Sequence, residues 1–440
     1  MAVTFHPEAA KRFDELANKL RGYVCEVNDP SNRPQKDYHL YPAAKLGPQD
    51  IKDVQFLTNS VRDDHGNEVG RLWKDQDRWF GLLSTGYAQM RDLAFRLEKT
   101  GDIQGRVGVE FLLCTIVNWL RESHVYSLTE YLVACCQEAI TEHDIWIPLF
   151  RVYCASQFSL GAVTFRPISE QIMNGFFDPP GRLPITEAER QSLDKRRSQL
   201  QGTLAACVKV TAEAKLATQI ARSTAGESIA LLRFLSPANL TPGIRSYCLP
   251  LGREAVELAT EILVCGDRIT SISQESVVCG PTGADLDGAV SYHAETLSRL
   301  HDLASNRKTE FRRQLYDALL LYSRNSVTSD VAEKLVFVLV AVESMLLRDA
   351  NEPIAKNIGE RMAFLIGDTL EARKAIVTSV DQAYRLRSAF VHHGNSIEDV
   401  EIVGRFLVHA WETFRTLLYR IDRTDSKMSL IQELEDRKLT

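Results

Sequence analysis

Apolar residues recur every three or four positions along most of the last third of the chain, the spacing that places them on one face of a helix. This pattern predicts amphipathic helices over residues 308–322, 329–347, 352–366, 371–391 and 398–420. Asp330 and Pro353 stand at helix starts, and Gly394 stands where a glycine would end its helix. Helices with short connections pack as antiparallel bundles, so we expect residues 286–440 to form one.

The pattern before residue 286 is more mixed. From about residue 72 to 149 the helical spacing returns and predicts three or four helices, whereas residues 158–165 and 261–278 resemble strands. Thr186 with Glu189 forms a capping box, which we expect to open a helix reaching about residue 222. The expected fold class is mainly α: a mainly helical region at 1–150, an α+β region at 151–285 and a helical bundle at 286–440.

Composition and charge narrow the class of protein. The chain has 440 residues, 45% of them apolar and 25% charged, as in soluble globular proteins. Its net charge of −6 lacks the positive excess of proteins that coat nucleic acid, so any nucleic-acid contact must be local to a cleft. The sequence contains no P-loop, GxGxxG, HExxH or GxSxG motif.

The cysteines and the apolar segments indicate a cytoplasmic protein. The nine cysteines include no CxxC motif, and several lie in apolar runs, as reduced and buried thiols do. The most apolar stretch, residues 335–347, contains Glu343 and is shorter than the ~20 residues that a membrane span needs. The first residues lack the apolar segment of a signal peptide. We therefore expect no membrane association.

Residues 384–395 (YRLRSAFVHHGN) concentrate arginine and histidine at the end of a predicted helix. Arginine grips a phosphate through two hydrogen bonds and keeps its charge, while histidine can move a proton near neutral pH. Arg385 lies seven positions before His392, and Ser388 lies four before it, so both share its face of the helix. This combination suits the chemistry of a phosphate.

Arg387 and His392 are five positions apart, which an ideal helix separates by about 140°. Three arrangements can bring them to one phosphate. The last turn can be distorted near Gly394, the long side chain of Arg387 can wrap round the helix, or a second subunit can complete the site.

The segment resembles the RX4–6H signature of HEPN domains, and the spacing RSxxVHxG resembles the Apea-like HEPN branch. The signature covers residues 387–392, and the spacing falls on Arg387, Ser388, Val391, His392 and Gly394. The apolar helix at 335–347, the run Glu360–Ala363 with Leu365 and the upstream LLRF at 231–234 are also similar to that branch. The strong resemblance covers about residues 305–423 and a weaker one reaches back to about residue 200, whereas residues 1–150 resemble no family.

The resemblance implies a dimeric endoribonuclease that needs no metal or other cofactor. His392 would act on the attacking ribose 2′-hydroxyl or the leaving oxygen, Arg387 would hold the scissile phosphate, and the product would be a 2′,3′-cyclic phosphate. It also implies a regulated toxin or anti-phage defence effector. The partners are then RNA, a second copy of the chain, and a phage-derived or protein trigger at the N-terminal region. HEPN toxins modified by a nucleotidyltransferase carry a tyrosine where this chain has Gly394 and Asn395.

Alternatives remain open for individual residues and for the whole motif. Arg385, Ser388, His393, Asn395 and Glu343 are supporting candidates. His393 can instead cap the helix, Arg385 can be a solvated helix residue, and Glu343 can join a structural ion pair with Arg361. The bundle can also be a non-catalytic module for dimerisation or RNA binding, or belong to a toxin restrained by a separate antitoxin.

Overall fold

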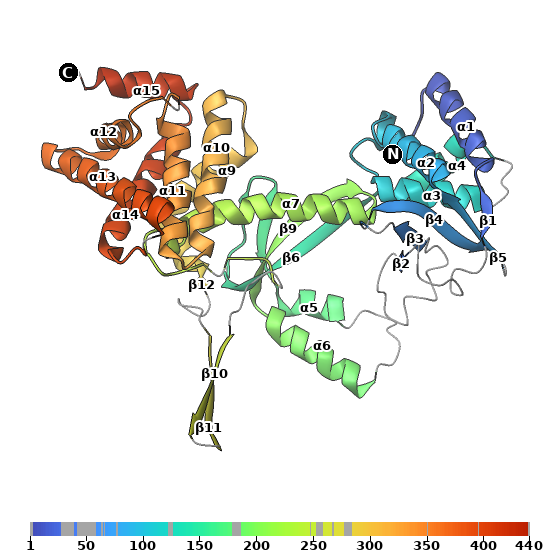
Figure 1. Cartoon of the computed structure of the whole chain (residues 1–440), viewed down its shortest axis with the longest axis horizontal. Helices are drawn as coiled ribbons and strands as arrows, with labels where there is room; N and C mark the ends of the chain where they lie inside the picture. Colours follow the sequence, from blue (N-terminus) through green and yellow to red (C-terminus); the bar gives the residue numbers. More distant parts are fainter. Residues whose placement is uncertain are drawn as a thin grey trace. The chain divides into compact units, whose positions relative to one another are not determined.

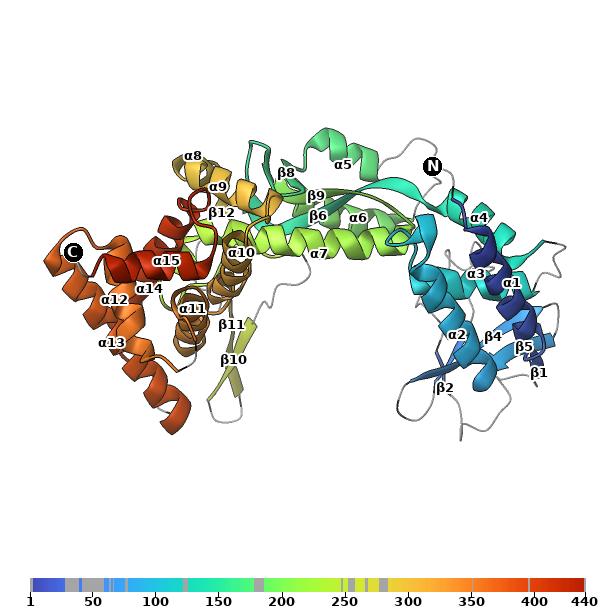
Figure 2. The ribbon, with the colours of Figure 1, turned by 90° about the horizontal axis from the view of Figure 1, so that it is seen from above.

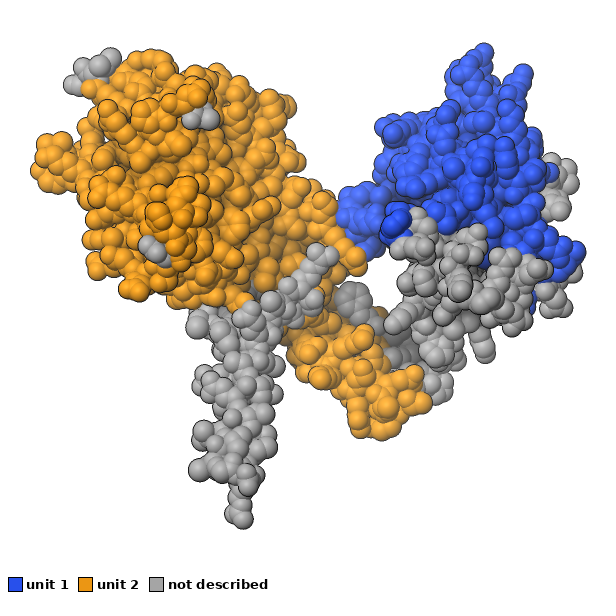
Figure 3. Space-filling view, in the orientation of Figure 1, with its two compact units in different colours: residues 1–144, 209–221 blue, residues 145–208, 222–440 orange. Residues whose placement is uncertain are grey.

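The computed structural model divides into two compact units (Figure 3): unit 1 contains residues 1–144 and 209–221, and unit 2 contains residues 145–208 and 222–440. The strand β6 (Thr141–Tyr153), the strand β9 (Thr203–Ala212) and the helix α7 (Ala214–Leu232) contain residues of both units. The structure describes residues 3–27, 39–41, 59–62, 65, 67–75, 78–121, 126–177, 186–246, 248–251, 258–265, 268–276, 284–349, 351–394 and 396–438.

Unit 1 contains an antiparallel five-stranded sheet that the helical spacing did not predict. Its strand order is β1-β5-β4-β3-β2, with bounds Cys25–Val27, Arg78–Leu83, Glu68–Asp75, Asn59–Arg62 and His39–Tyr41. The helix expected to begin near residue 72 is therefore wrong up to Leu83. The three- and four-residue spacing of Phe80, Leu83 and Tyr87 misled because it crosses the junction between β5 and a helix at Ser84. Gly81 lies opposite Leu72 in the sheet, where a Cβ atom would meet the leucine side chain.

Four helices pack with this sheet (Figure 1): α1 (Pro7–Arg21), α2 (Thr85–Glu98), α3 (Val109–Arg121) and α4 (Leu128–Ala139). The helices α2 to α4 confirm the helical part of the prediction for this stretch, but the prediction of helix up to residue 149 is wrong from Thr141, where the strand β6 begins. Ser127 opens α4 with a capping box in which its side chain pairs with Glu130. Met90, Leu97 and Trp119 are buried in the shared core.

A second five-stranded sheet has the strand order β12-β6-β9-β8-β7, and most of its residues belong to unit 2. Its remaining strands are β7 (Phe158–Leu160), β8 (Val163–Pro167) and β12 (Ala284–Asp285), and the helices α5 (Glu170–Phe177) and α6 (Glu187–Leu200) follow β8. The capping box of Thr186 is confirmed, but the helix expected to reach residue 222 is wrong. It ends at Leu200 because Gly202, with a φ of +73°, turns the chain into the apolar strand β9.

The strands predicted over residues 261–278 are confirmed as a hairpin. β10 (Leu258–Cys265) pairs antiparallel with β11 (Arg268–Ser276), and the two form a two-stranded sheet. The sequence boundary expected at residue 285 falls just before the first helix of the bundle, α8 (Leu286–Tyr292).

The predicted C-terminal helical bundle is confirmed (Figure 1). After α8, its helices are α9 (Ala294–Ser305), α10 (Glu310–Tyr322), α11 (Val331–Leu346), α12 (Ile354–Ile366), α13 (Leu370–His393), α14 (Val400–Leu418) and α15 (Lys427–Asp436). The chain is therefore mainly α, with a mixed α+β region before the bundle.

The apolar stretch noted in the sequence forms α11, which contacts α10 and α12 to α15. Asp330 caps its N-terminus by accepting a hydrogen bond from the backbone N–H of Glu333. Leu335, Val338 and Val342 on this helix are fully buried, and burial of each such side chain stabilises the fold by roughly 1.5–3 kcal/mol. The helix α11 is thus the centre of the bundle core.

The helix α13 is the longest element of the bundle, with 24 residues. Figure 2 shows its C-terminal end projecting beyond the neighbouring helices. Gly394 ends the helix in the left-handed conformation, with a φ of +65°, as the sequence predicted. The projecting end carries the arginine and histidine segment.

Candidate functional site

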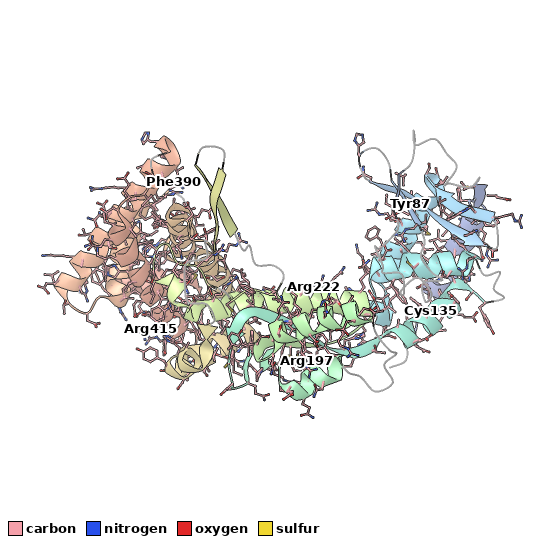
Figure 4. The ribbon with its side chains drawn as sticks, turned by 90° about the horizontal axis from the view of Figure 1, so that it is seen from below. Tyr87, Cys135, Arg197, Arg222, Phe390 and Arg415 are labelled. Atoms are coloured by element: carbon pink, nitrogen blue, oxygen red, sulfur yellow. The ribbon has the colours of Figure 1, made fainter. Side chains whose placement is uncertain are left out.

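The last turns of α13 carry Arg387 and His392 on a largely solvent-exposed helix end. Arg387 is half-buried, while Ser388, Val391, His392 and His393 are exposed. Figure 4 labels Phe390 near this projecting end. A ligand from solvent can therefore reach both predicted catalytic side chains.

Arg387 has a guanidinium group that no carboxylate neutralises among the described residues. Its Nε atom is shielded from solvent and has no hydrogen-bond partner. A buried donor without a partner costs about 1–3 kcal/mol, and no hydrogen bond at Nε fixes the guanidinium within the described structure. The guanidinium is close enough to Tyr384 to influence the pKa of its hydroxyl.

Tyr384 connects α13 to the central helix of the bundle. Its hydroxyl donates a hydrogen bond of 2.8 Å to Oε1 of Glu343 on α11. Burial raises the pKa of Tyr384, and the adjacent Glu343 carboxylate raises it further, so the hydroxyl stays protonated and remains a donor. This bond fixes the face of α13 that also carries Arg387.

The structural alternative for Glu343, an ion pair with Arg361, is wrong. Arg361 is buried and binds Glu352 through two hydrogen bonds of 2.7 and 2.9 Å, and it binds Glu435 at 2.8 Å. These contacts tie α12 to the turn before it and to α15. Tyr384, and not Arg361, is therefore the hydrogen-bond partner of Glu343.

The supporting candidates differ in their surroundings. Arg385 is exposed and forms an ion pair of 2.6 Å with Asp381 one turn earlier, which fits the solvated helix residue of the alternative interpretation. His393 lies beside His392, with the ring centroids 6.5 Å apart. Ser388 lies one turn before His392 and is exposed. Asn395 lies outside the described residues.

The helix geometry removes one of the three ways of joining Arg387 to His392. The helix α13 continues to His393, and the N–H of Gly394 closes it by bonding to the carbonyls of Ala389 and Phe390. No distortion before Gly394 brings the two side chains to one face. A wrapped arginine side chain or a second subunit remains.

Sequence reasoning missed Tyr384, although it lies in the segment that was singled out. Two signals point to it. Tyr384 precedes Arg387 by three positions and so shares its face of the helix, and Glu343 interrupts an apolar helix and needs a donor.

Unit 1 contains a separate pocket of about 540 Å³ over β4 and α2, lined by Glu68, Val69, Ser84, Tyr87, Ala88, Arg91, Asp92 and Phe95. The backbone of Ser84 has a φ of +47°, which residues other than glycine rarely adopt. Burial and the nearby Glu68 raise the pKa of Tyr87 to about 12, so its hydroxyl is neutral. None of the candidates from the sequence lies here.

The strand β4, which lines this pocket, also carries the buried cation Arg71. Arg71 binds Glu68, and it binds the two carboxylate oxygens of Glu110 at 2.9 and 2.8 Å. The pair with Arg71 lowers the pKa of Glu110, despite its partial burial. Arg71 therefore holds β4 against α3 below the pocket.

Metal ligands and membrane-spanning helices are two further features that bear on the class of site. The described parts of the chain contain no group of three or more His, Cys, Asp or Glu residues arranged to hold a metal ion. No helix within the described ranges is long and apolar enough to span a membrane.

Comparisons with protein-family models, with curated proteins and with solved structures found no match to this chain. The residues of α13 and their surroundings are therefore the basis for inferring a function.

Proposed function

We propose that the chain is a metal-independent endoribonuclease of the HEPN type. The observation that carries the proposal is the unneutralised guanidinium of Arg387 on the same exposed helix end as the imidazole of His392. A permanent cation suits the phosphate of RNA, and an imidazole suits proton transfer. The resemblance of residues 387–392 to the RX4–6H signature supports the same chemistry.

The proposed reaction divides the work between two side chains. His392 takes the proton from the ribose 2′-hydroxyl, or gives one to the leaving 5′-oxygen, as the 2′-oxygen attacks phosphorus. Arg387 stabilises the extra negative charge on the phosphoryl oxygens in the transition state. The products are a 2′,3′-cyclic phosphate and a 5′-hydroxyl end. Tyr384 and Glu343 hold the helix face that bears Arg387.

The proposed active form is a homodimer joined through the bundle. Arg387 and His392 point to different sides of an unbroken helix, so one copy can supply the arginine and the other the histidine to one phosphate. Val391 is 53% exposed between them, and a second copy would cover this apolar side chain.

We assign the regulation of this nuclease to unit 1. A free ribonuclease would damage its host, so a cytoplasmic toxin or anti-phage effector needs restraint. The pocket over β4 and α2 is a site where a phage-derived molecule or a partner protein can bind. Restraint by a separate antitoxin is the alternative, and expression of the chain alone distinguishes the two: growth continues under self-restraint and stops without the antitoxin.

The test is RNA cleavage by the purified chain and four variants. We expect His392→Ala to lower the rate by about 100- to 10,000-fold. We expect Arg387→Ala to lower it by about 100- to 1,000-fold. The controls are His6→Ala, which removes an exposed histidine directly before α1, and Arg96→Ala, which removes an arginine paired with Asp92 on α2. Both should cleave like the parent.

Equal cleavage by the parent and the His392 and Arg387 variants would exclude catalysis at this site. RNA binding or dimerisation without any cleavage would favour the non-catalytic module instead. These outcomes are separable because binding and oligomeric state can be measured on the same protein samples.

A further inference from the structure

A row of aromatic and cationic side chains crosses the surface of unit 2 along α8, α9 and α14. This aromatic row contains Tyr292, His293, Trp411, Arg415, Tyr419 and Arg299. Each member contacts the next: the ring of Tyr292 lies 4.7 Å from that of His293, which lies 5.9 Å from Trp411. Figure 4 labels Arg415 in a part of the bundle separate from Phe390 at the end of α13.

The centre of the row is fixed by the bundle core. The indole N–H of Trp411 donates a hydrogen bond of 3.0 Å to the carbonyl of Phe234. The same ring stacks on the Phe234 side chain at 5.6 Å, with an angle of 15° between the planes. Phe234 is buried, so Trp411 is a rigid support for its neighbours.

Carboxylates and aromatic rings hold the guanidinium groups of the two arginines in the row in defined orientations. Arg415 binds Glu412 at 2.8 Å and lies over the rings of Trp411 and Tyr419, at 5.6 and 5.9 Å from their centroids. Arg299 binds Asp422 at 2.5 Å and lies 5.9 Å from the Tyr419 centroid. Ordered guanidinium planes beside rings are surfaces on which planar bases can stack.

Tyr292 is the exposed end of the row. It is 85% exposed, the largest value among the exposed large hydrophobic side chains of the described residues. Among the described residues, the edge-to-face contact with His293, at 88°, is the ring contact that orients Tyr292. An aromatic ring left in water beside a fixed row gains most from a planar ligand that covers its face.

We propose that the aromatic row binds unpaired bases of single-stranded nucleic acid. Base stacking on rings and guanidinium planes tolerates any base and contributes about 1–3 kcal/mol per base, and it uses the planes of Arg415 and Arg299 even though both are paired with carboxylates. Among the exposed large hydrophobic side chains of the described residues the row contributes Tyr292 alone, whereas each partner of a standard protein interface buries about 800 Å². The observations therefore favour a nucleic acid over a protein partner.

The row is a second site, separate from the proposed nuclease site. The helix α14 connects the two: it begins at Val400, shortly after Gly394 in the sequence, and reaches Arg415 about 22 Å further along its axis. Bases held on the row would belong to nucleotides remote from the cleaved bond. The inference rests on the proposed function only for this link, because binding to the row can be measured without cleavage.

The test uses the full chain carrying His392→Ala, so that no oligonucleotide is cleaved. Fluorescence anisotropy measures its affinity for labelled ten-nucleotide oligouridylate and oligothymidylate, the RNA and DNA arms. Adding Tyr292→Ala should weaken binding by about 5- to 150-fold, the effect of losing one stacked base. The matched control, Tyr126→Ala, removes a tyrosine that is 64% exposed on unit 1 and should leave the affinity unchanged.

Arg415→Gln provides a second variant that keeps a polar side chain while removing the guanidinium plane, and it should also weaken binding. Loss of affinity in either the RNA or the DNA arm supports the proposal, and loss in the RNA arm alone adds recognition of the 2′-hydroxyl. Equal affinities of the Tyr292→Ala and Tyr126→Ala proteins would overturn it, as would a background protein that binds neither oligonucleotide. Cleavage by the chain with His392 intact reports separately on the proposed nuclease.

Discussion

The hydroxyl of Tyr384 donates a hydrogen bond of 2.8 Å to the carboxylate of Glu343, joining the helix that carries Arg387 to the central helix of the bundle. Both residues are half-buried, so solvent does not freely replace the lost partner when one is removed. The pair accounts for an acidic residue in the most apolar helix of the chain. It also explains how the projecting end of α13 keeps a defined orientation.

Tyr384→Phe should lower the free energy of unfolding by about 1–3 kcal/mol, because it leaves the Glu343 carboxylate without its donor. Glu343→Gln should cost less, since the amide oxygen still accepts from the tyrosine. The double variant should cost less than the sum of the two single changes, because both act on one bond. Urea unfolding of the four proteins measures this, and additive effects would show that the two side chains are not coupled.

Gly394→Ala should destabilise the end of α13 by about 1 kcal/mol. An alanine pays for the left-handed conformation at a φ of +65°, although its Cβ would meet no atom within 4 Å. Hydrogen exchange of the amides in the last turn should become faster. Gly288→Ala on α8 is the control, because Gly288 has open space and no positive φ, and there the substitution should be neutral or stabilising.

Lys334 should make the bundle more stable as the pH rises. The side chain is 0% exposed, and its Nζ donates one hydrogen bond of 2.8 Å to the carbonyl of Ala238. Burial lowers its pKa from 10.5 to about 8, so between these pH values the unfolded chain binds a proton that the folded chain has released. Stability therefore rises with pH across this window, by up to about 3 kcal/mol.

Unfolding of the parent and of Lys334→Met, measured from pH 7 to pH 11, isolates this contribution. At pH 7 Lys334→Met should have the higher free energy of unfolding. As the pH rises and the lysine loses its proton, the free energy of unfolding of the parent should increase relative to that of the variant. A difference that does not change with pH would contradict the burial of a charged amine.

Glu352 should make the fold more stable as the pH rises through the acidic range. The two hydrogen bonds from Arg361 lower the pKa of Glu352 from 4.5 to about 2. Its contribution is complete above about pH 4.5 and is lost as the pH falls towards 2, in total about 2–3 kcal/mol. Glu352→Gln should therefore be less stable than the parent at neutral pH and equal to it near pH 2, as measured by thermal unfolding. Parallel curves would contradict this.

Sequence patterns predicted the bundle well because its helices are long and their apolar spacing is uninterrupted. The caps at Asp330 and Gly394 were visible for the same reason, as they follow from residue type alone. The strands at 68–83 were missed because apolar residues in a short hairpin also fall three or four positions apart by chance. The end of α6 was missed because the polar helix and the apolar strand after it are separated only by the turn at Gly202.

The candidate site was only partly predictable. Arg387 and His392 stood out by composition, and the helix end was correct. The partner of Glu343 could not be assigned, because the choice between Arg361 and Tyr384 depends on how three helices pack, which no local pattern encodes.

The most direct test of the account is to map the RNA ends produced by the purified chain. Cleavage by the parent should leave 2′,3′-cyclic phosphate ends, detected by mass spectrometry of a defined oligoribonucleotide, and both His392→Ala and Arg387→Ala should abolish them while His6→Ala retains them. Cyclic phosphate ends formed equally by the parent and by both site variants, or no cleavage by the parent after the trigger or antitoxin has been accounted for, would contradict the central claim.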